Sequence, residues 1–188
     1  MKTIYKKLFF LVFLSVTVAC SSDDSTSTDD DDGNTGENNT FEILLTTEGT
    51  QAEYSGSMPN ESPIALYVKD VETGIETVSL HFEHGDLTMT AAFILDDNGQ
   101  PLPFGEDGGD DQEESLMNLT TSAQGNLLMT NGNATLSNYQ VYGATQQGNN
   151  EGGFASFKVV FEGTFVSTSD QGVTYEASGE VVVNPFGI

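Results

Sequence analysis

Residues 77–95 read Thr-Val-Ser-Leu-His-Phe-Glu-His-Gly-Asp-Leu-Thr-Met-Thr-Ala-Ala-Phe-Ile-Leu, and this stretch decides the fold. Apolar residues alternate with polar or small ones on both sides of Gly85-Asp86, which is the pattern of two half-buried strands. A two-residue Gly-Asp loop suits a tight hairpin turn. The resulting hairpin has one apolar face, and its expected cross-strand pairs are His84 with Leu87, Phe82 with Met89, Leu80 with Ala91 and Val78 with Phe93.

The C-terminal part of the chain has the same alternation. Residues 157–165 and 173–183 each place apolar residues on one face, and Asp170-Gln171-Gly172 lies between them. A three-residue loop ending in glycine predicts Phe161 opposite Val181, Val159 opposite Val183 and Gly163 opposite Gly179. Facing glycines are typical of a bend or of a place where an aromatic ring lies across the pair. We expect this to be the longest hairpin, at the centre of the sheet.

Further strands are predicted at Phe41–Thr46, Gln51–Ser57, Ile64–Val71, Asn126–Thr130 and Ala134–Tyr142. Helical periodicity is almost absent; a helix is possible only around Gln112–Asn118, and it is not the favoured interpretation there. Short antiparallel strands separated by Gly/Asn turns indicate an all-β domain. We therefore expect residues 41–188 to form a single antiparallel β-sandwich or flattened barrel, following a signal peptide and a disordered acidic tether.

The N-terminus has the three parts of a secretory signal. Residues 1–19 combine early lysines, an apolar run over 8–18 and a small residue, Ala19, before the only cysteine, Cys20. The run is shorter than the ~20 apolar residues that span a bilayer. An ordinary cleaved signal and an uncleaved anchor are the alternatives, but a lone cysteine at this position has no intramolecular disulfide partner.

Val18-Ala19-Cys20 resembles the end of a bacterial lipobox, although Thr17 stands where such motifs usually have leucine. Ser21-Ser22-Asp23-Asp24 is similar to the acidic export signal of outer-membrane lipoproteins from the Bacteroidota, especially flavobacteria. The strand pattern of the last 55 or so residues also resembles small flavobacterial lipoproteins of unknown function. This resemblance implies lipidation of Cys20, an outer-membrane location and exposure at the cell surface, with a periplasmic orientation as the alternative. Several acyl chains hold a protein on a membrane, whereas one binds only reversibly.

Residues 20–40 predict a tether, because the 20 residues after Cys20 contain seven acids and no apolar side chain. Such a segment buries too little to offset its ordering entropy. The whole chain carries 29 acids and five basic residues, three of which lie in the leader, and it has no arginine. Nucleic acid binding is therefore excluded as a function class, because phosphates are held by lysine and arginine.

Two groups of residues are candidate sites of chemistry. His81, Glu83 and His84 are the histidine cluster, but in a strand His81 and Glu83 share one face and His84 takes the other, so we expect no metal or catalytic site. Residues 96–114 hold Asp96, Asp97, Glu106, Asp107, Asp110, Asp111, Glu113 and Glu114. Calcium takes about six to eight oxygen ligands, yet this spacing does not fit the helical calcium loop, so we expect a mobile acidic loop with at most weak calcium binding.

No catalytic or cofactor motif is present, so the expected function is a non-enzymatic, membrane-anchored lipoprotein whose β domain binds a glycan, calcium or a surface protein. Two alternatives stay open. A lipocalin-like carrier of small ligands would have an apolar cavity in place of a packed core. A calcium-dependent glycan-binding or hydrolytic accessory domain would need a cleft with facing carboxylates.

Overall fold

The computed structural model describes residues 39–58, 63–105, 114–170 and 172–185, all of which lie in one compact unit, Thr35–Ile188. These residues form strands and turns, and no helix occurs among them. The strands are β1 Asn39–Thr47, β2 Thr50–Met58, β3 Ile64–Asp70, β4 Glu76–His84, β5 Leu87–Leu95, β6 Leu116–Thr121, β7 Gly125–Gln147, β8 Asn150–Ser167 and β9 Thr174–Val183.

All pairings are antiparallel, and the strand order is β2-β1-β9-β8-β3-β4-β5-β6-β7 with an additional β8–β7 pairing. Strand β8 closes part of the sheet into a ring, because it is long enough to pair with three other strands. One edge pairs first with β3 over residues 150–154 and then with β9 over residues 157–166, while the other edge pairs with β7. Strands β3 to β8 therefore form a closed ring, and β9, β1 and β2 extend from it.

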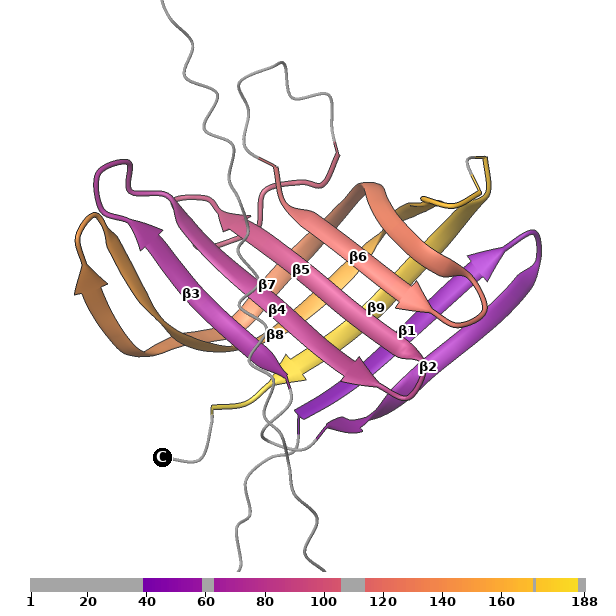
Figure 1. Ribbon diagram of the computed structural model, residues 1–188, viewed down its shortest axis with the longest axis horizontal. Helices are drawn as coiled ribbons and strands as arrows, with labels where there is room; N and C mark the ends of the chain where they lie inside the picture. Colours follow the sequence, from indigo (N-terminus) through magenta and orange to yellow (C-terminus); the bar gives the residue numbers. More distant parts are fainter. Residues whose placement is uncertain (1–38, 59–62, 106–113, 171, 186–188) are drawn as a thin grey trace, which may run out of the picture. The chain divides into compact units, whose positions relative to one another are not determined.

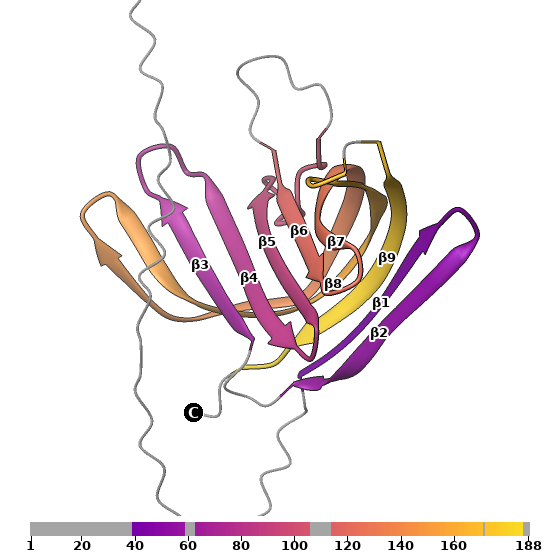
Figure 2. The same cartoon turned by 45° about the vertical axis from the view of Figure 1, so that its right-hand side comes forward.

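Figure 1 shows the two layers that result, and Figure 2 shows them after a 45° turn. Strands β3, β4, β5 and β6 run side by side in one layer. Strands β9, β1 and β2 run across them in the other, and the curved β7–β8 hairpin joins the two layers. The arrangement is consistent with a β-sandwich or a flattened barrel, which confirms the expected fold class.

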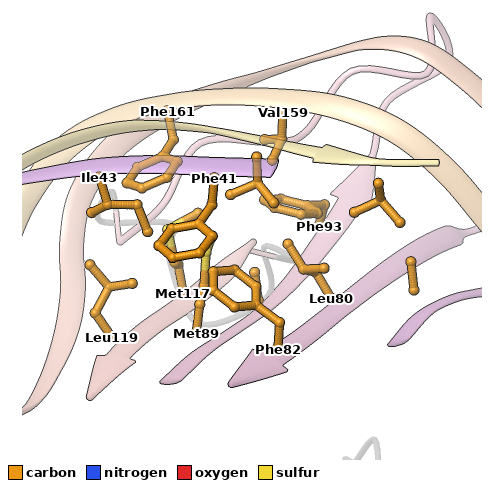
Figure 3. Packing of buried hydrophobic residues seen from close by; sticks show 14 of the residues in the cluster. Phe41, Ile43, Leu80, Phe82, Met89, Phe93, Met117, Leu119, Val159 and Phe161 are labelled. Atoms are coloured by element: carbon orange, nitrogen blue, oxygen red, sulfur yellow. The ribbon is translucent and has the colours of Figure 1, made fainter. Parts of the chain in front are cut away.

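The core lies between the layers and contains buried apolar side chains from both (Figure 3). Phe41 and Ile43 come from β1, and Val159 and Phe161 come from β8. The layer of β4, β5 and β6 contributes Leu80, Phe82, Met89, Phe93, Met117 and Leu119. Ring contacts cross the core: Phe41 and Phe82 have centroids 5.1 Å apart, and Phe93 meets Phe157 edge-on at 6.2 Å.

The β4–β5 hairpin has the predicted register in full. His84 pairs with Leu87, Phe82 with Met89, Leu80 with Ala91 and Val78 with Phe93. All of these side chains except His84 are buried. Gly85 adopts φ of 61°, the left-handed conformation that the tight turn requires.

The predicted register of the β8–β9 hairpin is wrong by two residues. Phe161 pairs with Gly179, Val159 with Val181, and Gly163 with Ala177. The connection is longer than the predicted three residues, because the Ser167 hydroxyl accepts a hydrogen bond from Asp170 N and the turn begins there. A two-residue shift keeps the same side chains inward, since the side-chain period of a strand is two.

The predicted strands at 126–130 and 134–142 are parts of one strand, β7, which stays continuous through bulges at Met129/Asn131, Ser137/Gln140 and Tyr142/Thr145. The β7–β8 hairpin, not β8–β9, is the longest. Within Gln112–Asn118, Leu116–Asn118 belong to strand β6, so the helix alternative is wrong for these residues.

Strand β2 closes the side of the unit through its inward side chains. Tyr54 Oη donates a hydrogen bond of 3.0 Å to Gln124 Oε1 in the turn between β6 and β7, and Met58 is buried. Asn184 N donates to Asn39 Oδ1 at 2.6 Å, which joins the start of β1 to the residue after β9. These contacts attach β2 to the β6–β7 turn and the start of β1 to the chain after β9.

Candidate acidic groove

The outward side of β1, β9, β8 and β7, which we call the acidic face, contains a groove. Alternation along each strand brings a grid of side chains to this side, because the inward positions fill the core. One row runs Glu42, Glu180, Val160 and Thr135 across the four strands. The next row runs Leu44, Ser178, Glu162 and Asn133.

Two adjoining hollows follow these rows. The first has a volume of about 610 Å³, and the second has about 460 Å³. They share Leu44, Asn133, Glu162 and Ser178, so together they form one groove that crosses the strands. The groove has hydrogen-bonding carboxylate, amide and hydroxyl groups around two apolar side chains, Leu44 and Val160.

Charge on this face is unbalanced. Glu42 and Glu180 are direct cross-strand partners, an arrangement in which like charges repel. Lys158 Nζ lies 2.8 Å from Glu180 Oε2, whereas Glu42 and Glu162 make no ion pair with a described residue. The Thr164 hydroxyl donates to Glu176 at 3.1 Å. The groove therefore presents more acceptors than donors.

The outward side of β3 to β6, with the start of β8, has a different composition, and we call it the neutral face. Its apolar members are Ile64, Leu66, Val68, Ala92, Ile94, Leu116 and Phe154. Its polar members are Thr77, Ser79, His81, Thr88, Thr90, Asn118 and Thr120. Carboxylates occur on these strands' outward positions only at two ends, Asp70 and Glu83.

The histidine cluster lies as the strand pattern predicts. The His81 ring nitrogens lie 3.1 Å from Thr90 Oγ1 and 3.7 Å from Glu83 Oε1 on the outward side. The His84 ring instead contacts Phe41 edge-on at 5.1 Å. Within the described ranges, no group of three or more histidine, cysteine or acidic side chains is arranged to hold a metal ion.

The first part of the predicted acidic loop is a hydrogen-bonded turn. Asp96 Oδ1 accepts from Asn98 N at 2.8 Å and from Gln100 N at 2.9 Å. The Gln100 and Asn98 hydrogen bonds lower the pKa of the Asp96 carboxyl. Phe104 then buries its side chain in the core, with its ring centroid 6.2 Å from that of Phe93. Residues 106–113 lie outside the described residues, so the mobility and calcium binding of this loop stay predictions.

A polar cluster occupies one end of the layers, at β3, β4 and β7. Lys69 Nζ lies 2.7 Å from Glu76 Oε1, and this hydrogen bond raises the pKa of the lysine. Burial, followed by the Glu76 and Glu151 carboxylates, raises the pKa of Tyr67. Burial chiefly raises the pKa of Tyr139, whose buried hydroxyl has no hydrogen-bond partner in the described structure. These groups close the end of the core.

Cys20, the predicted lipidation site, lies outside the described residues, as do Asp107, Asp110 and Asp111 of the acidic loop. Inspection of the described ranges finds no helix long and apolar enough to cross a membrane. Sequence reasoning missed the groove, because it depends on which strands become neighbours. The outward carboxylates were visible as alternating residues, but β1 and β9 are far apart in the chain.

No protein-family model, curated protein or solved structure matches this chain.

Proposed function

We propose that this chain is a non-enzymatic, lipid-anchored outer-membrane lipoprotein that binds a ligand in the groove of its acidic face. The groove is the observation that carries the proposal. It joins hollows of about 610 and 460 Å³ on a sheet face where hydrogen-bonding side chains surround Leu44 and Val160. A shallow groove on a rigid sheet suits an extended ligand that lies across the strands.

The ligand is one rich in hydrogen-bond donors, namely hydroxyl or ammonium groups. Glu42, Glu162 and Glu180 supply carboxylate acceptors. The Lys158 ammonium group forms an ion pair with Glu180. Charge-assisted hydrogen bonds to carboxylates are stronger than those between neutral groups. A neutral or amino-bearing glycan and a lysine-containing peptide both have this chemistry, whereas an acidic polysaccharide is repelled.

The packed interior favours this proposal over the carrier alternative. Six phenylalanine side chains, Phe82, Phe93, Phe104, Phe157, Phe161 and Phe165, are among the largest fully buried side chains between the layers. An interior filled to this extent is typical of a sandwich core and not of a ligand cavity. The proposal therefore assigns ligand binding to the outside of the sheet.

Anchoring at Cys20 completes the proposal. A lipid on Cys20, followed by the acidic tether, holds the β unit near the membrane while leaving the groove in solution. Metabolic labelling with an alkyne fatty acid in a flavobacterium tests this part. We expect labelled protein in the outer-membrane fraction, and we expect Cys20→Ser to abolish both the label and the membrane association.

The binding part is tested on an array of neutral, amino-bearing and acidic glycans, with a lysine-rich peptide as a separate arm. We expect binding to the donor-rich probes and none to the acidic glycans. The double variant Glu42→Gln/Glu162→Gln should weaken binding about tenfold, or about 1.4 kcal/mol. Glu83→Gln removes one carboxylate at the edge of the opposite layer, and it is the matched control for Glu162→Gln alone. Equal losses in both variants would contradict a groove-specific interaction.

A further inference from the structure

The neutral face differs from the acidic face in charge, because few of the outward side chains on its described strands are carboxylates. Its carboxylates, Asp70 and Glu83, stand at two ends of the outward positions, and the acidic face on the other layer has Glu42, Glu162, Glu176 and Glu180. Depletion of charge and enrichment of apolar side chains distinguish the centre of a contact surface. This difference in charge between the two faces indicates that the neutral face is a contact surface for an apolar partner that does not bind the acidic face.

An apolar stripe runs along one strand of this face. Ile64, Leu66 and Val68 are outward on β3, and their exposed fractions are 48%, 40% and 43%. Leu66 is the direct cross-strand partner of Phe154, which is 51% exposed. The outward side of a solvated antiparallel sheet normally carries polar residues. Four neighbouring apolar side chains therefore form a patch and not a scatter of single exposed residues.

The size of the face argues against a second copy of the chain as its occupant. Five neighbouring strands spaced about 4.8 Å apart, each contributing about six residues, cover roughly 24 by 20 Å. That footprint, about 500 Å², is small beside the ~800 Å² of accessible surface per partner that a stable protein complex buries. A contact of this size needs another interaction to hold it in place.

The tether supplies that interaction. Figures 1 and 2 show that β1, which begins at Asn39, and β3 start at the same end of the β unit. A coil of about 20 residues has an end-to-end distance of ~25 Å. Tethering at that length gives an effective concentration in the millimolar range, which is enough for a weak apolar contact.

We propose that the neutral face rests on the lipid surface to which the chain is anchored, with Leu66 and Phe154 at the centre of the contact. This inference rests on the anchoring at Cys20 in the proposed function. Because the acidic face belongs to the other layer, the same orientation turns the groove away from the membrane. It also keeps the carboxylates of the groove away from lipid phosphates, which would repel them.

The chain contains no tryptophan, so a single introduced tryptophan reports its own surroundings. We would prepare the chain from Cys20 onward, which retains the whole compact unit, and couple Cys20 to a maleimide lipid in phosphatidylcholine vesicles. Phe154→Trp places the reporter on the neutral face. Val160→Trp is the matched control, because Val160 is 45% exposed on the acidic face.

Brominated lipids quench only tryptophan that contacts the acyl region. We expect several-fold stronger quenching of Phe154→Trp than of Val160→Trp. Adding Leu66→Asp to Phe154→Trp should reduce its quenching to the level of the Val160→Trp control. Leu44→Asp, on the acidic face, should leave it unchanged, and unfolding curves verify that each variant is folded.

Equal quenching of the two reporters, or none in either, would overturn the proposal. A blue-shifted Phe154→Trp spectrum without vesicles, together with a dimer in sedimentation velocity, would also overturn it and assign the face to a second copy. Chemical coupling replaces the cell's lipidation in this experiment. Failure here is therefore distinguishable from failure of the fatty-acid labelling that tests the anchor.

Discussion

Gly179 lies directly opposite Phe161 across β8 and β9, and the Phe161 ring occupies the space that a side chain at position 179 would need. A Cβ atom at position 179 would lie 2.9 Å from the ring atoms Cε1 and Cζ and 2.7 Å from the Glu42 carbonyl oxygen. An aromatic ring across a glycine was expected for this hairpin, although the glycine was paired with a different residue. The contact also joins β1 to the pair, since Glu42 belongs to β1.

Gly179→Ala should destabilise the fold by about 1–3 kcal/mol, because overpacking forces the ring or the β1 backbone to move. Urea unfolding followed by circular dichroism measures this. Gly152→Ala is the control, since its added Cβ would have only an ordinary contact of 3.7 Å with the Tyr67 carbonyl oxygen. Similar destabilisation by both substitutions would show that loss of glycine, and not the ring contact, is responsible.

Phe104→Ala should cost about 3–5 kcal/mol, because it removes a fully buried ring from the core. This residue comes from the segment after the Asp96 turn, so its loss would also release that segment from Gly132, its bridge partner on β7. Phe154→Ala removes the same ring from an exposed position and should change the unfolding free energy far less. A small effect of Phe104→Ala would mean that the segment does not pack as described.

Glu42→Lys should stabilise the domain, because a lysine there would face Glu180 in place of a like charge. Direct cross-strand pairs of opposite charge contribute about 0.2–1 kcal/mol. Thr40→Lys is the control for added positive charge, since its partner on β9 is Val182. The gain of Glu42→Lys over this control should shrink in high salt, and thermal unfolding at two ionic strengths would measure it.

Asp96→Asn should remove a pH-dependent part of the stability. The pKa of Asp96 is lowered by hydrogen bonds in the folded chain, so its contribution is present above the unfolded pKa and is lost as pH falls through the folded value. The melting-temperature difference between the native chain and the variant should be constant above about pH 5 and should fall below about pH 4. A difference that does not change with pH would contradict this role of the carboxylate.

Local pattern predicted the β4–β5 hairpin completely, because alternation and a two-residue turn agree on one register. The β8–β9 register was wrong because hydrogen bonds of the Ser167 side chain lengthen the turn, and alternation alone cannot detect a two-residue shift. Leu116–Thr121 was not recognised as a strand, since six residues beside an acid-rich segment carry a weak periodic signal. Asn126–Tyr142 was divided in two because the bulges of β7 interrupt the alternation.

The groove was beyond sequence reasoning for a different reason. Glu42 and Glu180 are partners only because β1 pairs with β9. In the sequence, 137 residues lie between them. No short-range pattern specifies such a pairing. Part of the neutral face could be predicted from the sequence, since the outward positions of β4 and β5 follow from the predicted hairpin.

Because β8 pairs with three strands, β3, β7 and β9, the order in which the strands are synthesised affects how the chain folds. Closure of the ring requires β3 to meet residues 150–154, and outside the ring β1 must meet β9, so both pairings join distant parts of the sequence. A high contact order of this kind slows folding, because loop-closure entropy is lost before the contacts form. Until the C-terminal strands arrive, β1 and β3 each have one open edge. We therefore expect the chain to fold late, after nearly all of it has been synthesised, and to be most prone to aggregation just before that step.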